Sequence, residues 1–220
     1  MKRKIITTGD GSKTIQISDW DEQYHSKHGA IQEAYHVFIE MGLSLFADRE
    51  LSILEIGFGT GLNAFITFLE AEKRNLVVNY NGVEKFPVTV EEVQQLNYVS
   101  ELKAENYEDV FSRMHDSPWE RDNLISEKFR LTKRQLDFSA IKGEETFDLI
   151  YFDAFGARVQ PELWTEDIFS RMYGVLKVGG VLVTYAAKGS VRRAMQAVGF
   201  EVERLPGPPG KREMLRAVRY

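Results

Sequence analysis

Residues 51–62 read LSILEIGFGTGL: an apolar run with an acid at Glu55, then glycines at Gly57, Gly59 and Gly61. The apolar run predicts a strand, and the glycines predict a tight turn into a following helix. In α/β sheets such a turn brings bare backbone close to a nucleoside ligand. The stretch therefore predicts an α/β fold with a ligand site at the end of this strand.

Strand and helix patterns alternate on both sides of this stretch. We expect strands at 4–8, 14–18, 51–56, 76–84, 129–136, 147–153, 181–186, 200–205 and 214–219. We expect helices from Gly29 onward, at 62–74, after Pro87, near 104–114, at 166–176 and at 189–198. The polar stretch 117–127 is the predicted surface loop, and Gly179 and Gly180 are expected to end the helix before them.

The alternation predicts a doubly wound, mostly parallel sheet whose ligand crevice lies at the carboxyl ends of the strands. The last two strands are joined by a loop too short for a crossover helix, so they should pair antiparallel. We expect one domain over residues 1–220, with an N-terminal extension and helix at 1–48 and the core at 49–220.

Composition narrows the class of protein. The chain has 220 residues, no cysteine, and no apolar run long enough to span a membrane, which needs about 18 residues. Disulfides and thiolate metal sites are thus excluded, and a cytoplasmic protein is the simplest interpretation. The net charge of −5 argues against a general nucleic-acid coat. Residues 186–220 nevertheless carry eight Lys or Arg against three Glu, either to meet a polyanion or as a solvated rim.

Two ligand classes compete for the glycine turn: a dinucleotide and S-adenosylmethionine. The dinucleotide fingerprint places its third glycine at position 62, which is Leu62 here. The carboxylate of Glu55, at the lip of the turn, would repel a pyrophosphate but suit a cationic methionine end. Glu84 ends the next strand, where an acid can accept hydrogen bonds from both ribose hydroxyls. A turn that bound no ligand would leave Glu55 and Glu84 unexplained.

Further acids and an aromatic follow later strands. Asp137 comes just after a predicted strand, either as a partner of the adenine amino group or as a helix N-cap. Asp153 ends the apolar strand FDLIYFD, so its carboxylate should point into the crevice where a substrate meets the cofactor. Trp164 either stacks on a base or packs in the core, and Thr165 is expected to cap the next helix.

Several motifs in the same order resemble the tRNA 5-methylaminomethyl-2-thiouridine methyltransferases of the MnmC/MnmD type. They are GFGTGLN from Gly57, EKFP from Glu84, DAF-x5-PELWT from Asp153, VRRAMQAVGFEVERLPGPPGKREML from Val191, and YHSKHGAIQEAYHVF from Tyr24. The resemblance covers nearly the whole chain. It implies a Rossmann-like class I S-adenosylmethionine-dependent methyltransferase fold.

The implied activity is N-methylation of the 5-aminomethyl group of wobble 5-aminomethyl-2-thiouridine in tRNA, which gives 5-methylaminomethyl-2-thiouridine. The implied partner is the tRNA anticodon stem-loop, and we expect a cytoplasmic monomer. Two-domain members add an FAD-dependent oxidase; this chain stops just after the methyltransferase motifs, so no FAD domain is expected. The chain departs from the family at Val159, often a lysine, and at Arg134-Gln135, often Gly-Asp. The adenine contact therefore falls to Asp137 or Gln135.

The resemblance also implies roles for individual residues. Asp153 is the expected catalytic residue, where its carboxylate would stabilise the ammonium that develops during transfer. The expected cofactor-binding residues are Glu55, Gly57, Phe58, Gly59, Thr60, Gly61, Asn63, Glu84, Lys85, Asp137 and Asp153. The expected substrate and RNA contacts are Gln32, Glu33, Phe155, Trp164, Arg192, Arg193, Lys211 and Arg212. Of these, Gln32 and Glu33 could equally form the outer face of their helix, and the four basic residues a solvated edge.

Three other readings remain. His25 and His28 near Asp21 lack a firm third metal ligand, and this methyl transfer needs no metal, so none is expected. An aminopropyltransferase would share the fold, but it would need several acids for its polyamine, and only Asp153 is conspicuous. A non-catalytic RNA-binding module would have no reason to retain the glycine turn with its acids.

Overall fold

The computed structural model describes residues 2–220. Its strands are β1 (Arg3–Thr7), β2 (Lys13–Ile17), β3 (Glu22–Gln23), β4 (Glu50–Ile56), β5 (Val77–Val83), β6 (Asp122–Ser126), β7 (Phe129–Arg134), β8 (Phe147–Phe152), β9 (Leu176–Thr184), β10 (Glu201–Pro206) and β11 (Glu213–Val218). Its α-helices are α1 (Ala30–Ala34), α2 (Leu62–Lys73), α3 (Val90–Val93), α4 (Tyr98–Glu101), α5 (Glu108–Asp116), α6 (Glu166–Val175) and α7 (Gly189–Ala197). A π-helical turn, Tyr35–Glu40, continues α1.

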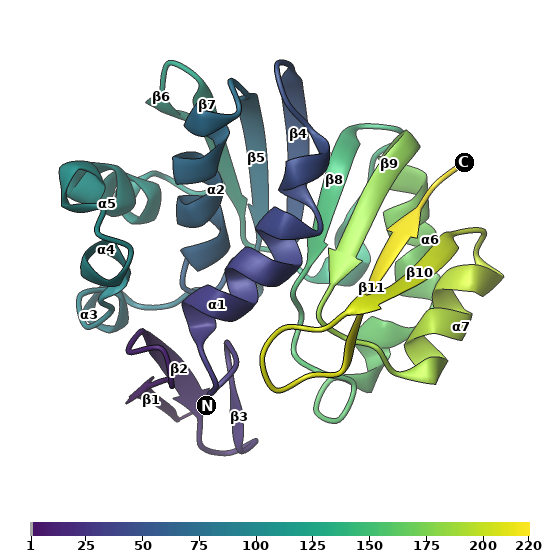
Figure 1. Cartoon of the computed structure of the whole chain (residues 1–220), viewed down its shortest axis with the longest axis horizontal. Helices are drawn as coiled ribbons and strands as arrows, with labels where there is room; N and C mark the ends of the chain where they lie inside the picture. Colours follow the sequence, from purple (N-terminus) through teal and green to yellow (C-terminus); the bar gives the residue numbers. More distant parts are fainter. Residues whose placement is uncertain (1) are drawn as a thin grey trace.

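The main sheet has eight strands in the order β10-β11-β9-β8-β4-β5-β7-β6. Strands β9, β8, β4, β5 and β7 run parallel to one another, and β11 joins β9 antiparallel. The expected mostly parallel sheet with an antiparallel C-terminal pair is therefore confirmed. A separate three-stranded antiparallel sheet, β1-β2-β3, lies beside one end of the main sheet, below α1 in Figure 1.

The central strands are buried on both faces, as helices on either side of a parallel sheet require. In β8, every residue is buried: Leu149 and Tyr151 pack into a core with α2 and α5, while Ile150 and Phe152 pack into a second core with α6 and α7. Side chains alternate between the two faces of a strand, so FDLIYF supplies both cores at once. This strand ends at the edge where the site lies.

Two local predictions were wrong. The stretch 117–127 is not all loop, because β6 pairs antiparallel with β7 at the edge of the sheet. Gly179 and Gly180 do not end a helix: α6 stops at Val175, and both glycines lie inside β9. Polar composition hid β6 because an edge strand exposes one side to water.

None of the helices within residues 2–220 combines the length and the apolar character needed to cross a membrane.

Candidate cofactor and acceptor site

A cavity of about 1010 Å³ opens at the carboxyl ends of β4, β5 and β8. Gly57, Glu84 and Asp153, which follow these three strands, all line it. The segment 20–28 and residues 210–213 of the loop between β10 and β11 line other parts of it. The strand order reverses around β4, and α/β sheets bind ligands at such a point. The volume is at the upper end of small-molecule pockets, about 300–1,000 Å³.

The glycine turn after β4 is packed too tightly for side chains. Gly57 has φ +92°, and a Cβ there would lie 2.6 Å from the backbone oxygen of Asp153. Gly59 has φ +50°, and its Cβ would lie 2.9 Å from the ring of Tyr24. These glycines thus let the turn contact both the loop after β8 and the N-terminal segment.

Thr60 and Gly61 lie behind the turn, outside the cavity lining. The Thr60 hydroxyl oxygen accepts a hydrogen bond from the buried Tyr98 hydroxyl at 3.0 Å. Gly61 has φ +72° and precedes α2 as its N-cap. Their positions support the turn and the start of the helix, whereas Phe58 and Gly59 line the cavity itself.

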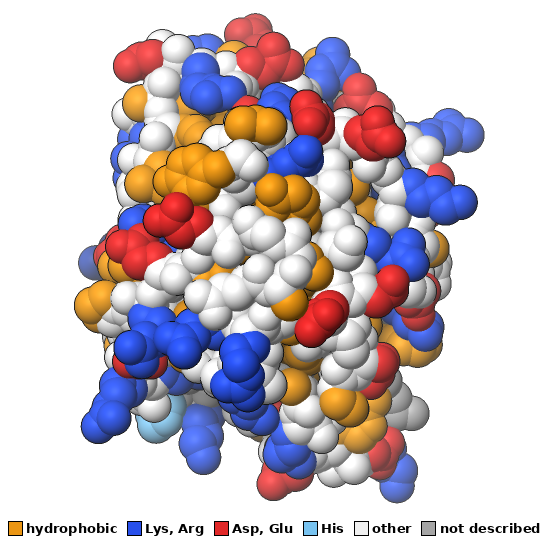
Figure 2. Space-filling view, turned by 90° about the vertical axis from the view of Figure 1, so that its right-hand side faces the viewer, with side chains coloured by type: hydrophobic (Ala, Val, Ile, Leu, Met, Phe, Trp, Pro, Cys, Tyr) orange, Lys and Arg blue, Asp and Glu red, His pale blue; other side chains and the backbone are white. Residues whose placement is uncertain are grey.

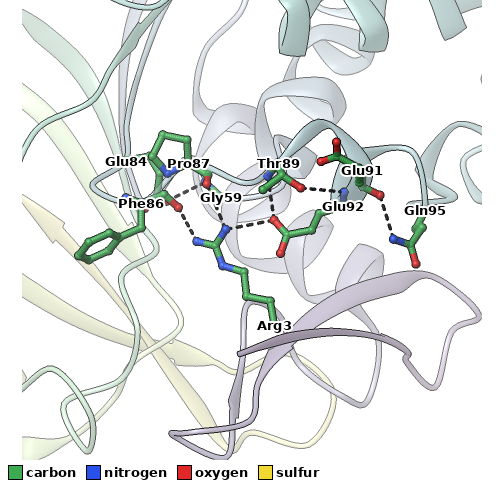
Figure 3. A network of polar contacts seen from close by, with 9 residues as sticks. All are labelled: Arg3, Gly59, Glu84, Phe86, Pro87, Thr89, Glu91, Glu92 and Gln95. Atoms are coloured by element: carbon green, nitrogen blue, oxygen red, sulfur yellow. Dashed lines mark hydrogen bonds and ion pairs between the residues drawn. The ribbon is translucent and has the colours of Figure 1, made fainter. Parts of the chain in front are cut away.

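Glu84 is held at the cavity by two backbone donors. Its Oε2 accepts from the Gly59 amide at 3.1 Å, and its Oε1 accepts from the Phe86 amide at 2.9 Å (Figure 3). Burial raises the pKa of Glu84, and the two amides act in the opposite direction because they favour the charged carboxylate. The carboxylate is thus fixed in place by two different loops and keeps lone pairs for a ligand.

Glu55 differs from its predicted place at the lip of the turn. It is fully buried and does not line the cavity. Its carboxylate accepts from the Asn63 amide at 2.9 Å and from the Tyr80 hydroxyl at 2.8 Å. Burial raises the pKa of Glu55 well above its usual range. Glu55 lies within β4, a central strand of the sheet, so its side chain is enclosed by protein. Its carboxylate orients the Asn63 side chain.

Asp153, unlike Glu55, reaches the cavity. Its Oδ2 accepts from the same Asn63 amide group at 2.9 Å, so Asn63 bridges the two carboxylates. Burial raises the pKa of Asp153 to about 7; the charge of Glu33 acts in the same direction, and the Asn63 hydrogen bond and Lys211 oppose it. The carboxyl group therefore titrates near neutral pH.

Glu33 and Lys211 form an ion pair in this cavity. Lys211 Nζ lies 2.5 Å from Glu33 Oε2 and 3.8 Å from the ring centroid of Tyr185. The other Glu33 oxygen accepts from the Ser26 amide at 3.1 Å. Glu33 is thus an inward-facing residue of α1. Lys211 therefore lies in the cavity with a carboxylate as its partner, and its contact with an RNA phosphate stays a prediction.

The other predicted RNA contacts lie in three different places. Gln32 is exposed and outside the cavity lining. Arg192 and Arg193 lie on α7, also outside the lining, whereas Arg212 is exposed at the rim of the cavity. On the face that carries α7 and the β10–β11 hairpin, Lys and Arg side chains gather toward the lower edge (Figure 2).

Aromatic side chains from the segment 20–24 and the loop after β8 line part of the cavity. Trp164 is buried, donates from Nε1 to the Phe155 backbone oxygen at 2.8 Å, and packs edge-on against Phe152. It therefore packs in the core while one part lines the cavity. The Phe155 ring contacts Trp20 and Tyr24 edge-on, at centroid distances of 5.6 and 5.0 Å.

Asp137 serves as a cap and also lines the cavity. Its Oδ1 accepts from the Ser139 amide at 2.9 Å, which caps the short 3₁₀ helix 138–140. Its Oδ2 accepts from Lys85 Nζ at 2.7 Å, and this hydrogen bond lowers the pKa of Asp137 to about 2. Gln135 lies outside the lining, so of the two adenine candidates only Asp137 is at the cavity.

His25, one of the two histidines in the N-terminal segment, is buried and contacts another side chain. His25 Nδ1 is 2.9 Å from the Thr14 hydroxyl, and the ring is buried. Across residues 2–220, no three His, Cys, Asp or Glu side chains gather as a metal would require.

Thr165 is the N-cap residue of α6 as expected, but its hydroxyl donates to the Glu162 backbone oxygen instead of capping the helix.

Sequence reasoning missed Trp20, Tyr24, Tyr185 and Arg3. The aromatic residues in the polar segment 20–24 were a signal, because isolated aromatics in such a segment need a surface to pack on. Arg3 gave no signal, since its partners lie more than 80 positions away in the chain.

A family model described as S-adenosyl-L-methionine-dependent methyltransferase matches residues 100–220. The chain therefore belongs to this family of methyltransferases, which is the class that the fold and the glycine turn define.

Within this family, the chain is similar to proteins of tRNA modification. The chain is 31% identical to the tRNA 5-methylaminomethyl-2-thiouridine biosynthesis bifunctional protein MnmC of Hydrogenovibrio crunogenus, over 97% of this chain and 33% of the relative. The protein of the same name from Cupriavidus metallidurans is 30% identical, over 95% and 33%. The chain thus spans about a third of these curated relatives.

Solved structures agree with the fold. MnmC2 from Aquifex aeolicus superposes with a TM-score of 0.81 at 26% identity, covering 100% of this chain and 70% of that one. Spermidine synthase from Thermotoga maritima superposes with a TM-score of 0.56 at 15% identity, covering 99% and 73%. The second likeness concerns the fold alone.

Proposed function

We propose that this chain transfers a methyl group from S-adenosylmethionine to the 5-aminomethyl nitrogen of wobble 5-aminomethyl-2-thiouridine in tRNA. The product is 5-methylaminomethyl-2-thiouridine. The observation that carries the proposal is Asp153: a carboxylate at the end of a central strand, in the cavity beside the glycine turn of a methyltransferase. The names of the MnmC relatives supply the tRNA and the product nucleoside, 5-methylaminomethyl-2-thiouridine.

The residues present fit the cofactor. Gly57 and Gly59 line the cavity and carry no side chain, so a ligand can approach their backbone closely. When bound, S-adenosylmethionine supplies an electrophilic methyl group. In the proposal Glu84 accepts hydrogen bonds from the ribose hydroxyls, Asp137 accepts from the adenine amino group, and Asn63 and Asp153 lie toward the methionine end.

Asp153 has two tasks in the proposal. Its carboxylate accepts a hydrogen bond from the substrate amine and so holds the nitrogen in line for displacement. As the N–C bond forms, positive charge appears on nitrogen, and the nearby carboxylate stabilises it. The secondary ammonium that results can then give its extra proton to Asp153, whose pKa of about 7 makes it a competent acceptor at neutral pH.

The acceptor base is proposed to enter between the aromatic wall of Trp20, Tyr24 and Phe155 and the loop that carries Lys211. Arg212 at the rim, with Arg192 and Arg193 on α7, would contact phosphates of the anticodon stem-loop. The monomeric state and cytoplasmic location belong to the proposal as well, and light scattering tests the first.

The deciding experiment incubates the protein and S-adenosylmethionine with tRNA that carries 5-aminomethyl-2-thiouridine, followed by digestion and nucleoside mass spectrometry. We expect the methylated nucleoside. Its absence would overturn the proposal. The aminopropyltransferase alternative predicts turnover with decarboxylated S-adenosylmethionine and putrescine instead. The binding-module alternative predicts that S-adenosylmethionine does not raise the melting temperature.

A further inference from the structure

Arg3 lies at the start of the small N-terminal sheet, yet its side-chain hydrogen bonds reach residues 86–92, which follow Glu84 in the chain. Its guanidinium donates to the backbone oxygens of Phe86, at 2.5 Å, and Pro87, at 3.0 Å (Figure 3). It also pairs with Glu92 Oε2 at 3.1 Å. The side chains of Arg3 and Glu92 are only 13% and 17% exposed, so solvent screens this pair less than it screens a surface pair.

Phe86 connects this cluster to Glu84. Its backbone oxygen accepts from Arg3, and its backbone N–H donates to Glu84 Oε1 at 2.9 Å. The backbone N–H and the backbone oxygen of Phe86 are therefore both hydrogen-bonded to side chains. The loop 84–89 has no regular secondary structure of its own, so these bonds define its path.

Glu92 is itself fixed. Its Oε2 accepts from the Thr89 amide at 2.8 Å, while the Thr89 hydroxyl accepts from the Glu92 amide at 3.3 Å, which is a capping box at the start of α3. One carboxylate thus holds both the helix start and the guanidinium (Figure 3). Arg3 is the only side chain that joins the N-terminal sheet to this loop through the bonds drawn there.

We propose that Arg3 is a positioning residue for the cofactor: by binding the Phe86 and Pro87 carbonyls and Glu92, it fixes the loop that aims the Glu84 carboxylate at the ribose hydroxyls. This inference rests on the part of the proposed function that assigns Glu84 to the ribose. The Arg3 charge also lowers the pKa of Glu84, against the larger effect of burial, and so favours the ionised acceptor.

Arg3 contacts the acceptor side of the cavity too. Its guanidinium carbon lies 5.7 Å from the ring centroid of Tyr24, which packs edge-on against Phe155. A lysine could supply the charge at position 3, but its single ammonium could not reproduce a fork that reaches two carbonyls and a carboxylate.

The test measures binding of S-adenosylhomocysteine and of its 2′-deoxy analogue by calorimetry, with the full chain. For Arg3→Ala we expect the Kd of S-adenosylhomocysteine to rise about tenfold, equivalent to about 1.4 kcal/mol. The preference over the 2′-deoxy analogue should shrink, because the loss acts through the ribose contact. Arg3→Lys should bind with intermediate affinity. In turnover, KM for S-adenosylmethionine should rise by a larger factor than KM for tRNA rises or kcat falls.

Arg130→Ala is the matched control, since Arg130 pairs with exposed Asp122 at the far edge of the sheet and should bind as the unmodified protein does. Glu84→Gln separates the two proposals. If Glu84→Gln binds normally, the ribose assignment is overturned. If Glu84→Gln weakens binding but both Arg3 variants bind normally, only the role of Arg3 is overturned. Non-additive losses in the Arg3→Ala, Glu84→Gln double variant would support it.

Discussion

Lys211 and Glu33 are 178 positions apart in the chain, and their side chains meet inside the cavity. The pair joins α1 to the loop between β10 and β11, and it lies close enough to Asp153 for both charges to act on its pKa, in opposite directions.

Substituting Lys211 and substituting Glu33 should shift the pH dependence of kcat/KM in opposite directions. Lys211 lowers the pKa of Asp153 and Glu33 raises it, so Lys211→Met should move the acidic limb of kcat/KM to higher pH and Glu33→Gln to lower pH. Measuring kcat/KM against pH for both variants checks this. Shifts in the same direction would mean that the pair acts only through packing.

Asp153→Asn should remove catalysis and leave cofactor binding. The amide keeps the size of the side chain but loses the charge that stabilises the developing ammonium, so we expect kcat to fall about 100-fold or more. Binding of S-adenosylhomocysteine, measured by calorimetry, should change by less than about threefold, or about 0.7 kcal/mol. A variant with normal kcat would reject Asp153 as the catalytic residue.

The rate should also depend on pH around neutrality. Burial raises the pKa of Asp153 to about 7, so the carboxylate form that the mechanism needs is present above this pH and lost below it. We therefore expect kcat/KM to decline as pH falls through about 7, and the decline should be absent from the residual activity of Asp153→Asn. Stopped assays between pH 5.5 and 9, with the salt concentration held constant, measure it.

Folding stability should weaken in acid through two buried histidines. Burial lowers the pKa values of His25 and His115 from 6.5 to about 4. As the pH falls, these histidines therefore bind protons in the unfolded chain at a higher pH than in the folded protein. The free energy of unfolding that is present above pH 6.5 is thus lost as the pH falls toward 4. The melting temperature should follow this window. His115→Gln should flatten the dependence, and an unchanged slope would contradict the assignment.

Gly57→Ala should destabilise the protein by about 1–3 kcal/mol, because the residue has a positive φ and its Cβ would approach a backbone oxygen. Gly174→Ala is the matched control: it lies in α6 with nothing within 4 Å of a Cβ, so the change should be neutral or stabilising. Urea unfolding of both variants measures the difference. Equal stability of the two would show that the turn can relax.

Arg212 and Arg193 should affect RNA binding through charge alone. If each contacts one phosphate, each change to Ala should weaken tRNA binding and reduce the slope of log Kd against log salt by about 0.7 to 0.9. Arg113→Ala is the control, because Arg113 is an exposed residue of α5 that pairs with the exposed Asp109. Filter binding across salt concentrations gives the slopes. Slopes equal to that of the control would mean that these arginines are solvent-exposed residues that do not contact RNA.

The sequence predicted the main sheet because its strong signals are local. Apolar runs such as 147–152 and the glycine turn after Ile56 each depend on neighbouring residues, and the structure has both where expected. The weaker elements failed for a physical reason: β6 is an edge strand with polar side chains, and the glycines of β9 resemble a helix end in sequence.

The site was harder to predict because it depends on long-range contacts. That Glu55, Glu84 and Asp153 end neighbouring strands follows from the topology, but the depth of each side chain does not. Glu55 is buried beneath the turn, whereas Asp153 reaches the cavity. Lys211 pairs with Glu33, and Arg3 binds the loop after Glu84, although the partners are far apart in the chain. No local sequence pattern indicates that such segments meet in the fold.

The position of β11 between β9 and β10 has a consequence for synthesis. A ribosome that has made the first 200 residues has already produced the glycine turn, Glu84 and Asp153. The strand that completes the sheet beside β9, and the loop that brings Lys211 to Glu33, are made only afterwards. The residues proposed to hold the cofactor are therefore synthesised before the loop that pairs with Glu33, and the sheet is complete only once β11 has been made.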